Sequence, residues 1–379
     1  MRLCVTVFIL CLSIIAKATD TTLTLNLLQR VKALQVNEAS VFPKGSFASY
    51  RTYQYNKDFQ KADINGFYTG LIVFTLRDIQ PKLTVWQQQI ADSIIQRALP
   101  VFDKFKNKKG RNTYNFWPTD TAQIFPNSGW LNWFNKSQSL PDDLDDTVII
   151  LLAMDANKST AAAIHTLMQG YTNNPQKKIN NTFPAYRDIG AYSTWFGEKM
   201  PVDFDVSVLS NILFFIQRYN LKWTAADSAS LLLIDKVISD KKHIDAPAYI
   251  SPHYASTPIV LYHFSRLMQV KPIEVLEKHK LVLIDQAKSY LQRDIPFMEK
   301  VLLQTALKRW GIDYSMRIHT NEKNMESLIE SEDFSFFIAN MASMYPDKVK
   351  KILGNAKIGE FRYYCPAYNH MLVLENILQ

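Results

Sequence analysis

The sequence predicts an all-α protein, and three observations support this fold class. Glycine is scarce, with 11 residues in 379, and long Leu-, Ile- and Ala-rich segments occupy much of the chain. Segments that are apolar on nearly every side recur along the chain, which predicts buried helices. Each has an amphipathic segment before or after it, so buried and surface helices alternate.

Six buried helices are predicted, each entered through a short polar stretch. Their predicted starts are Ile64, Asp146, Asp205, Thr257, Pro296 and Tyr368. The amphipathic partners are predicted at 21–36, 83–105, 158–170, 223–240, 272–292 and within 321–344. Such a repeat cannot bury its apolar faces alone, so neighbouring pairs must stack. An open superhelix and a closed ring of six inner and six outer helices both satisfy this requirement.

Polar, aromatic loops connect these helices. One loop is predicted from 37 to about 62, and two longer ones at 106–141 and 171–202. Long loops in a compact chain are usually functional or disordered. Their many aromatic residues favour ordered loops that cover a site: Trp117, Trp130, Trp133, Tyr192 and Trp195.

The N-terminus predicts export. Arg2, an apolar run from Leu3 to Ile15 and the small residues around Ala18 follow the pattern of a secretory signal peptide, with cleavage expected after Ala18. Residues 1–18 are therefore the predicted signal peptide and 19–379 a single domain in the periplasm or outside the cell. No later apolar run is long enough to cross a bilayer, so the mature chain is expected to have no transmembrane segment.

Charge and cysteine usage agree with an exported enzyme. The formal net charge of +8 is mild and its basic residues are scattered, so no nucleic-acid partner is expected. Cleavage of the signal peptide removes Cys4 and Cys11 and leaves Cys365, which cannot form an intrachain disulfide. The domain must rely on its core.

Four aspartates stand in five residues at the start of the second buried helix: Asp142, Asp143, Asp145 and Asp146. One or two would serve as an ordinary helix cap. If 142–154 is one helix, Asp142 shares a face with Asp145 and Asp146. Carboxylates this close repel one another, so at least one is expected to hold its proton unusually tightly. Helix capping alone and a chemical site both remain open.

The stretch Asp143-Leu144-Asp145-Asp146-Thr147, followed by an apolar helix, resembles the Asp-x-Asp-Asp-Thr motif of class II terpene cyclases, the squalene-hopene and copalyl-diphosphate type. In that family the middle aspartate protonates an alkene or epoxide. The resemblance therefore implies that Asp145 is the acid, with Asp143 and Asp146 as its flanking partners. It also implies the closed (α/α)6 toroid that these cyclases share with protein prenyltransferases and many polysaccharide-degrading enzymes.

A closed ring would gather the polar helix starts at one end of a central cavity, beneath the two aromatic loops. The residues expected there are Asn65, Asp142, Asp203, Asp205, His253, Tyr254, Asn369 and His370. Asp203 and Asp205 are also good helix caps, and His253 and His370 are also typical of hydrogen-bonded structural residues. The acidic stretch does not match a calcium loop, and the family uses it as an acid, so neither a metal nor another cofactor is expected.

Three functions remain open. The first is protonation of an apolar, isoprenoid-like substrate by Asp145. The second is a periplasmic or secreted glycan hydrolase or lyase in which Asp145 and Asp205 act as a carboxyl pair across a Trp-lined groove. The third is a non-catalytic carrier of a lipid or isoprenoid.

Overall fold

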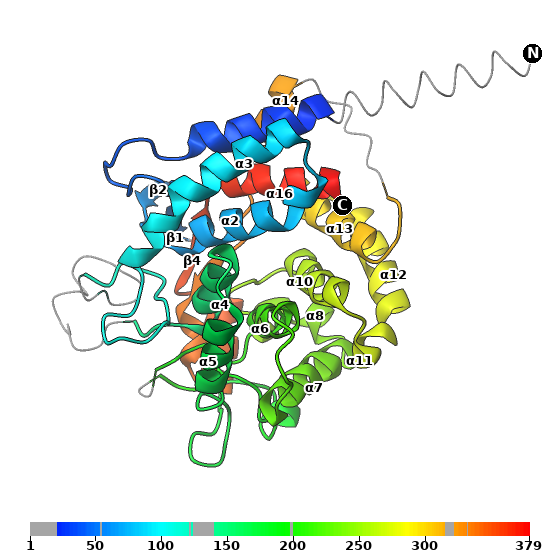
Figure 1. Ribbon diagram of the computed structural model, residues 1–379. Helices are drawn as coiled ribbons and strands as arrows, with labels where there is room; N and C mark the ends of the chain where they lie inside the picture. The colour runs from blue at the N-terminus through cyan, green and yellow to red at the C-terminus, as the bar shows by residue number, and fades with distance from the viewer. Residues whose placement is uncertain are drawn as a thin grey trace, which may run out of the picture.

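The chain is mostly helical, as predicted, but it also contains a small sheet (Figure 1). The computed structural model describes residues 21–53, 55–120, 123, 140–197, 200–314, 322–331 and 333–379. The predicted signal peptide and its cleavage site lie outside the described residues. None of the helices in the described ranges is both long and apolar enough to cross a membrane.

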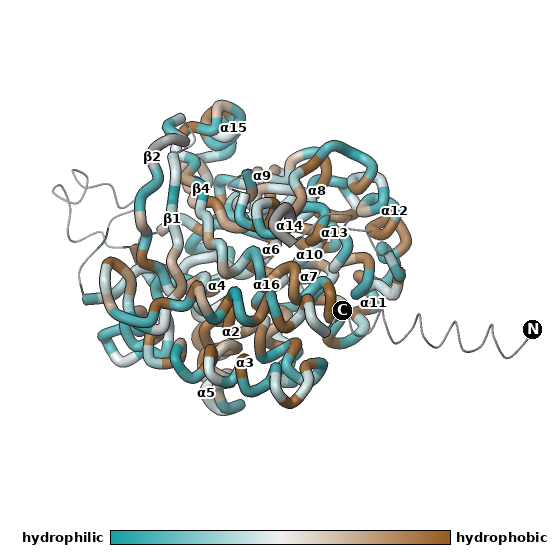
Figure 2. The backbone as a smooth tube through the Cα atoms, turned by 90° about the horizontal axis from the view of Figure 1, so that it is seen from above, coloured by the Kyte–Doolittle hydropathy of each residue, from teal (hydrophilic) through white to brown (hydrophobic). Residues whose placement is uncertain are grey.

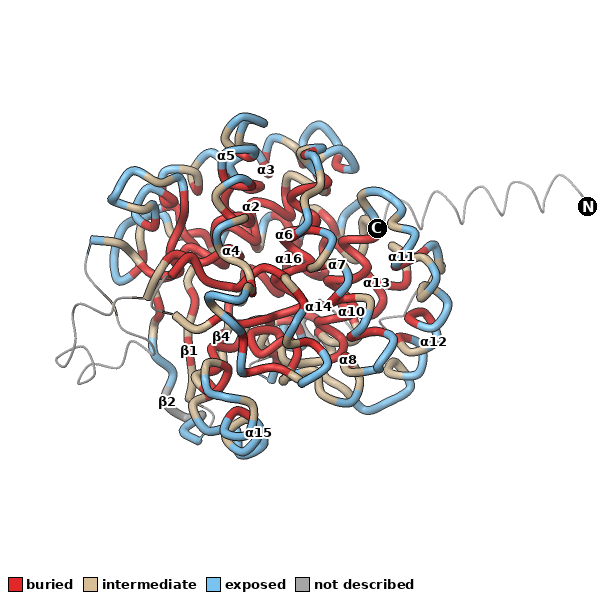
Figure 3. Tube along the Cα trace, turned by 90° about the horizontal axis from the view of Figure 1, so that it is seen from below, coloured by how far each residue is buried: buried red, intermediate tan, exposed pale blue. Residues whose placement is uncertain are grey.

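Six apolar helices form the interior, and each begins within three residues of its predicted start. They are α2 (Phe67–Ile79), α4 (Leu144–Ala153), α6 (Val206–Arg218), α10 (Thr257–Val270), α13 (Phe297–Arg309) and α16 (Pro366–Leu378). Each contacts the next one along the chain, and α16 contacts α2. Their side chains are buried along most of their length (Figure 3), and every residue of α4 is buried.

A second set of helices lies outside these six and buries mainly one face. It comprises residues 21–34, α3 (Val85–Ala98), α5 (Lys158–Met168), α7 (Ala225–Ser239), α12 (Lys280–Leu291) and α14 (Glu322–Ile329). Thr84 and Thr224 begin α3 and α7 with capping boxes, which satisfy otherwise free N–H groups in the first turn. Arg30, from the first of these helices, pairs with Glu330 just after α14, which links the first and last helices of this set.

The all-α prediction is wrong at one place, because four short strands form an antiparallel sheet in the order β2-β1-β4-β3. The strands are β1 (Tyr50–Tyr53), β2 (Asn56–Ala62), β3 (Ile338–Asn340) and β4 (Glu360–Tyr364). β1 and β2 lie in the predicted loop 37–62, and β3 lies inside the segment 321–344, where a helix was predicted. The strands β1 and β4 are rich in Tyr, which favours strands, but their partners lie far apart in the sequence.

Short helices connect the longer elements. They are η1 (Gln80–Lys82), η2 (Leu99–Lys104), η4 (Pro184–Tyr186), α8 (Lys242–Asp245), α9 (Pro247–Ile250), α11 (Glu274–Glu277), η5 (Met341–Met344) and α15 (Asp347–Asn355). The predicted helix 83–105 thus ends as a 3₁₀ segment, and 272–292 is divided in two. Figure 2 shows α15 at the edge of the molecule, beside the strands.

Candidate functional site

The acidic stretch is fixed between two loops at the start of α4. The backbone N–H of Asp143 donates to the carbonyl of Tyr114 at 3.2 Å, and that of Leu144 donates to Thr194 at 2.9 Å. On the other side, the N–H of Phe196 donates to the carbonyl of Asp142 at 3.0 Å. Both predicted aromatic loops therefore pair with the acidic stretch and determine where its side chains point.

The four aspartates differ in position. The helix starts at Leu144 rather than at residue 142, and Asp143 is its N-cap, accepting from the N–H of Asp146 at 2.6 Å. Asp142 lies before the helix and does not share its face. Its carboxylate accepts hydrogen bonds from Asn107 and Thr113, so it is occupied by the loop that contains these two residues.

Asp145 is buried, with 5% of its surface exposed, yet it lines a cavity. Its Oδ1 accepts from the Asn211 amide at 2.7 Å, and its Oδ2 accepts from the Tyr254 hydroxyl. Burial, followed by the negative charge of Asp143, raises the pKa of Asp145 to about 7, although the two hydrogen bonds act in the opposite direction. A carboxyl with this pKa can hold and release a proton near neutral pH.

Asp143 and Asp146 form a second acidic unit beside Asp145. Burial raises the pKa of Asp143 to about 6, and hydrogen bonds from Asp146 limit the rise. Burial and the charge of Asp143 raise the pKa of Asp146 well above its usual range. Two neighbouring buried carboxyls do not both ionise easily, so Asp146 keeps its proton while Asp143 is the one that ionises.

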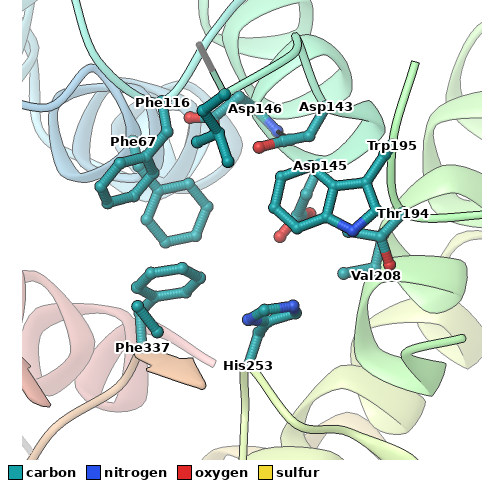
Figure 4. Close-up of a pocket in the computed structure, with 12 residues that line it drawn as sticks. Phe67, Phe116, Asp143, Asp145, Asp146, Thr194, Trp195, Val208, His253 and Phe337 are labelled. Carbon is teal, nitrogen blue, oxygen red and sulfur yellow. Dashed lines mark hydrogen bonds between the residues drawn. The ribbon is translucent and has the colours of Figure 1, made fainter. Parts of the chain in front are cut away.

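The cavity lies at the N-terminal ends of α2, α4 and α6 and has two unlike sides (Figure 4). The rings of Phe67, Phe116 and Phe337 form one side, and Asp145 and Trp195 face them from the other. The remaining lining residues are Leu140, Asp143, Asp146, Thr194, Val208, His253 and Ala339. An aromatic wall opposite carboxyl groups is an environment in which a positive charge is stabilised.

Little of the cavity is enclosed. Its empty space is about 450 Å³ when the open mouth is counted. The cavity volume itself is only about 30 Å³, which is room for about two waters. Polar side chains occupy the interior beneath the acids in the described part of the molecule. They include Asn211, Arg266 and the ion pair of Arg309 with Glu375.

His253 also lines the cavity, although the sequence favoured a structural, hydrogen-bonded role for it over a catalytic one. Its ring stacks on Phe337, with an interplanar angle of 13°, and meets Trp195 edge-on. Its Nε2 lies 3.7 Å from Asp203 Oδ2, beyond normal hydrogen-bond length, and has no hydrogen-bond partner among the described residues. Burial disfavours the imidazolium, but the carboxylates of Asp203 and Asp205 outweigh it and raise the pKa of His253.

Asp205 serves as a cap. It is the N-cap of α6 and its Oδ1 accepts from the N–H groups of Ser207 and Val208 at 2.9 and 3.2 Å. The Ser251 hydroxyl and the His253 N–H also donate to it, at 2.6 and 2.9 Å. With four donors around it, Asp205 has little remaining capacity to act as the second carboxyl of a glycosidase pair.

Asp203 and the remaining predicted site residues do not line the cavity. The Asp203 carboxylate lies between the Asn181 amide, at 2.9 Å, and Lys350 Nζ, at 3.9 Å. Five other predicted residues have partners elsewhere: Asn65 bonds Ser49, Trp117 bonds Asp63, Tyr192 bonds Asp227, Asn369 bonds Ile329 and His370 bonds Glu330. Trp130 and Trp133 lie outside the described residues.

Of the predicted residues, Asp143, Asp145, Asp146, Trp195 and His253 therefore meet at the cavity, with Tyr254 behind Asp145. Sequence reasoning missed the three phenylalanines and Asn211. Asn211 could have been recognised from its amide side chain in the middle of a largely apolar helix, because such a group is rarely buried without a partner. Phe337 gave no signal, since it lay in a segment predicted to be helical.

The described residues contain no group of three His, Cys, Asp or Glu side chains arranged to hold a metal ion. Asp143 and Asp145 accept hydrogen bonds from protein groups instead. Comparisons with protein-family models, with curated protein sequences and with solved structures gave no match.

Proposed function

We propose that this chain is an exported enzyme with an (α/α)6 toroid fold, in which the carboxyl group of Asp145 protonates an apolar, isoprenoid-like substrate. The toroid is supported by the order of contacts among α2, α4, α6, α10, α13 and α16, in which the last helix contacts the first. The residue pattern of 1–18 supports export.

One observation carries the proposal: a buried carboxyl with a pKa of about 7 lines a cavity opposite three aromatic rings. General acids work best when their pKa lies near the working pH. When Asp145 gives its proton to an alkene, the O–H bond breaks, and the alkene π electrons form the new C–H bond. The carbon left positive can be stabilised by the faces of Phe67, Phe116 and Phe337.

The small enclosed volume limits what reacts there. Room for about two waters fits the reacting end of a chain rather than a whole polycyclic product. The rest of the substrate would lie toward the open mouth of the cavity. This size favours a short acyclic isoprenoid over a triterpene. It also gives no support to a carrier that encloses an entire lipid.

A deuterium experiment tests the proposed function. The mature protein is incubated in D₂O with short linear isoprenoid alkenes, and deuterium bonded to carbon in the products is analysed by mass spectrometry. Protonation by a solvent-exchanged Asp145 should place one deuterium in each product molecule. Asp145→Asn should lower turnover by roughly 10²- to 10⁴-fold, the usual contribution of a general acid.

The control is Asp142→Asn, because the Asp142 carboxylate is occupied by Asn107 and Thr113 and does not line the cavity. This variant should retain most of the turnover. Products without deuterium, or unchanged turnover in Asp145→Asn, would reject Asp145 as the acid.

A further inference from the structure

A buried arginine lies in the interior beneath the acidic stretch. Arg266 of α10 is 3% exposed, and its guanidinium lies 5.3 Å from the ring centroids of Phe74 and Tyr262 and 6.0 Å from that of Phe214. These rings stabilise a cation only in part. Among the described residues Arg266 makes no ion pair, whereas the other buried arginine nearby, Arg309, pairs with Glu375.

Arg266 is connected to the acid through one amide. Its Nη2 donates to Asn211 Oδ1 at 2.5 Å, and Asn211 Nδ2 donates to Asp145 Oδ1 at 2.7 Å. The three residues come from α10, α6 and α4. Because a guanidinium carries only donors, it requires the amide oxygen to face it, and the amide N–H₂ then has to face Asp145. The orientation of Asn211 is therefore set by Arg266.

We propose that Arg266 is a positioning residue for Asp145: it holds the Asn211 amide with its N–H toward the carboxyl and is the buried counter-ion of the carboxylate left after proton transfer. This inference rests on the proposed function, because it assumes that Asp145 releases a proton to substrate. Arg266 lies on the interior side of the acid and does not line the cavity.

The charges in the interior support this role. A buried charge is costly unless another charge or hydrogen bonds compensate it. Glu375 is already occupied by Arg309 and by the Tyr262 hydroxyl. Arg266 therefore gains its compensating anion when Asp145 ionises, and this gain makes Asp145 a stronger acid than burial alone would allow.

Groups from several elements influence the same carboxyl. Asp143 and Asp205 raise its pKa, whereas Tyr254 and Asn211 lower it. The other charged or titratable groups near it are Asp146, from its own helix, His253, from the segment before α10, and Arg266. The test must therefore separate Arg266 from these neighbours.

Carboxyl carbon NMR of protein labelled at aspartate provides the measurement, and Asp145→Asn assigns the resonance. Arg266→Met should raise the pKa of Asp145 by about one unit or more, the scale expected when a nearby favourable charge is lost. Arg266→Lys keeps a donor-only cation and should cause a smaller rise. The matched control is Arg309→Lys, which preserves the partner of Glu375 and should leave the pKa of Asp145 unchanged.

A double variant tests the route. If Arg266 acts both as the counter-ion and through Asn211, then Asn211→Leu with Arg266→Met should raise the Asp145 pKa by more than Asn211→Leu alone but by less than the sum of the two single shifts. Additive shifts, or a wild-type pKa in Arg266→Met, would overturn the proposal. If Arg266→Met does not fold, Arg266→Lys gives the decision: a pKa equal to that of the wild type rejects the role.

This titration needs no substrate. A protein that turns over no isoprenoid but shows the predicted shifts would lose its proposed function and keep the Arg266–Asn211–Asp145 linkage. A protein that incorporates deuterium but shows no shift would keep the function and lose the linkage.

Discussion

The helices α4 and α6 begin with similar acidic sequences, yet the two starts have different structures. Both have an aspartate N-cap, Asp143 in α4 and Asp205 in α6, which accepts from N–H groups in the first turn. The next positions differ. The second and third residues of α4 are Asp145 and Asp146, whereas those of α6 are Ser207 and Val208.

This difference separates capping from chemistry. Asp205 is surrounded by four hydrogen-bond donors and has no place at the cavity. Asp145 has one donor on each oxygen and lines the cavity. A carboxyl at the N-cap satisfies the helix end, while an additional carboxyl in the first turn finds fewer donors. Burial raises the pKa of the N-cap carboxyls as well as that of Asp145, so the donors and the place at the cavity make the difference. The count of acids matters less than their place relative to the cap.

The largest effect expected from this comparison is on stability. Asp205→Ala removes the acceptor for two helix N–H groups, the Ser251 hydroxyl and the His253 N–H. At roughly 1 kcal/mol for each lost bond or cap, the free energy of unfolding should fall by about 3 kcal/mol at pH 7, measured in urea.

Asp145→Ala is the matched variant in the other helix. It also removes a buried carboxyl that is costly to ionise, so the loss of two hydrogen bonds is partly offset, and the free energy of unfolding should fall by about 1 kcal/mol. Equal losses in the two variants would show that the two helix starts are equivalent after all.

The dependence of stability on pH should report the raised pKa of Asp145. An unfolded aspartate has a pKa of about 3.9, and folding raises that of Asp145 to about 7. The folded protein therefore binds the proton more tightly, so this stabilisation is fully present below about pH 4 and is lost as the pH rises through 7.

The measurement compares unfolding free energies of the wild type and Asp145→Asn from pH 4 to pH 8. Their difference should change by up to about 4 kcal/mol, in favour of the variant as the pH rises. The other buried aspartates are present in both proteins and contribute similarly to each. A difference that does not vary with pH would mean that Asp145 titrates like an exposed aspartate.

The interior helices could be predicted because their signal is local. Each combines a polar start with a body that is apolar on all sides, and the same residues that bury the helix also mark it in the sequence. The sheet could not be predicted in this way. β1 pairs with β4, so that Tyr50 lies opposite Tyr364, and such distant pairing leaves no local pattern in strands of three to seven residues.

The difference between local and distant signals also explains which residues of the site could be predicted. Asp143, Asp145 and Asp146 are adjacent in the sequence, so their convergence was visible as a motif. Asn211 contacts Asp145 only because α6 packs against α4, and Arg266 contacts Asn211 only because α10 packs against α6. Each is a buried polar residue in a largely apolar helix, which indicates a buried partner but does not identify it.

The smallest expected effect concerns Tyr254, which contacts Asp145 from outside both helix starts. Its hydroxyl donates to Asp145 Oδ2 and favours the carboxylate. Tyr254→Phe removes this donor, so the pKa of Asp145 should rise above 7 by roughly half a unit to one unit, a scale set by about 1 kcal/mol for one hydrogen bond. Tyr262→Phe is the control, because its hydroxyl bonds Glu375 instead.

The direction of this shift has a kinetic consequence. An acid must be protonated to act, so turnover in Tyr254→Phe should persist to higher pH than in the wild type, while the maximal rate falls because the acid is weaker. A loss of rate with an unchanged pH profile would assign Tyr254 to packing around the cavity. A shift toward lower pH would contradict the hydrogen bond as the source of the effect, and with it the difference in donors that separates Asp145 from Asp205.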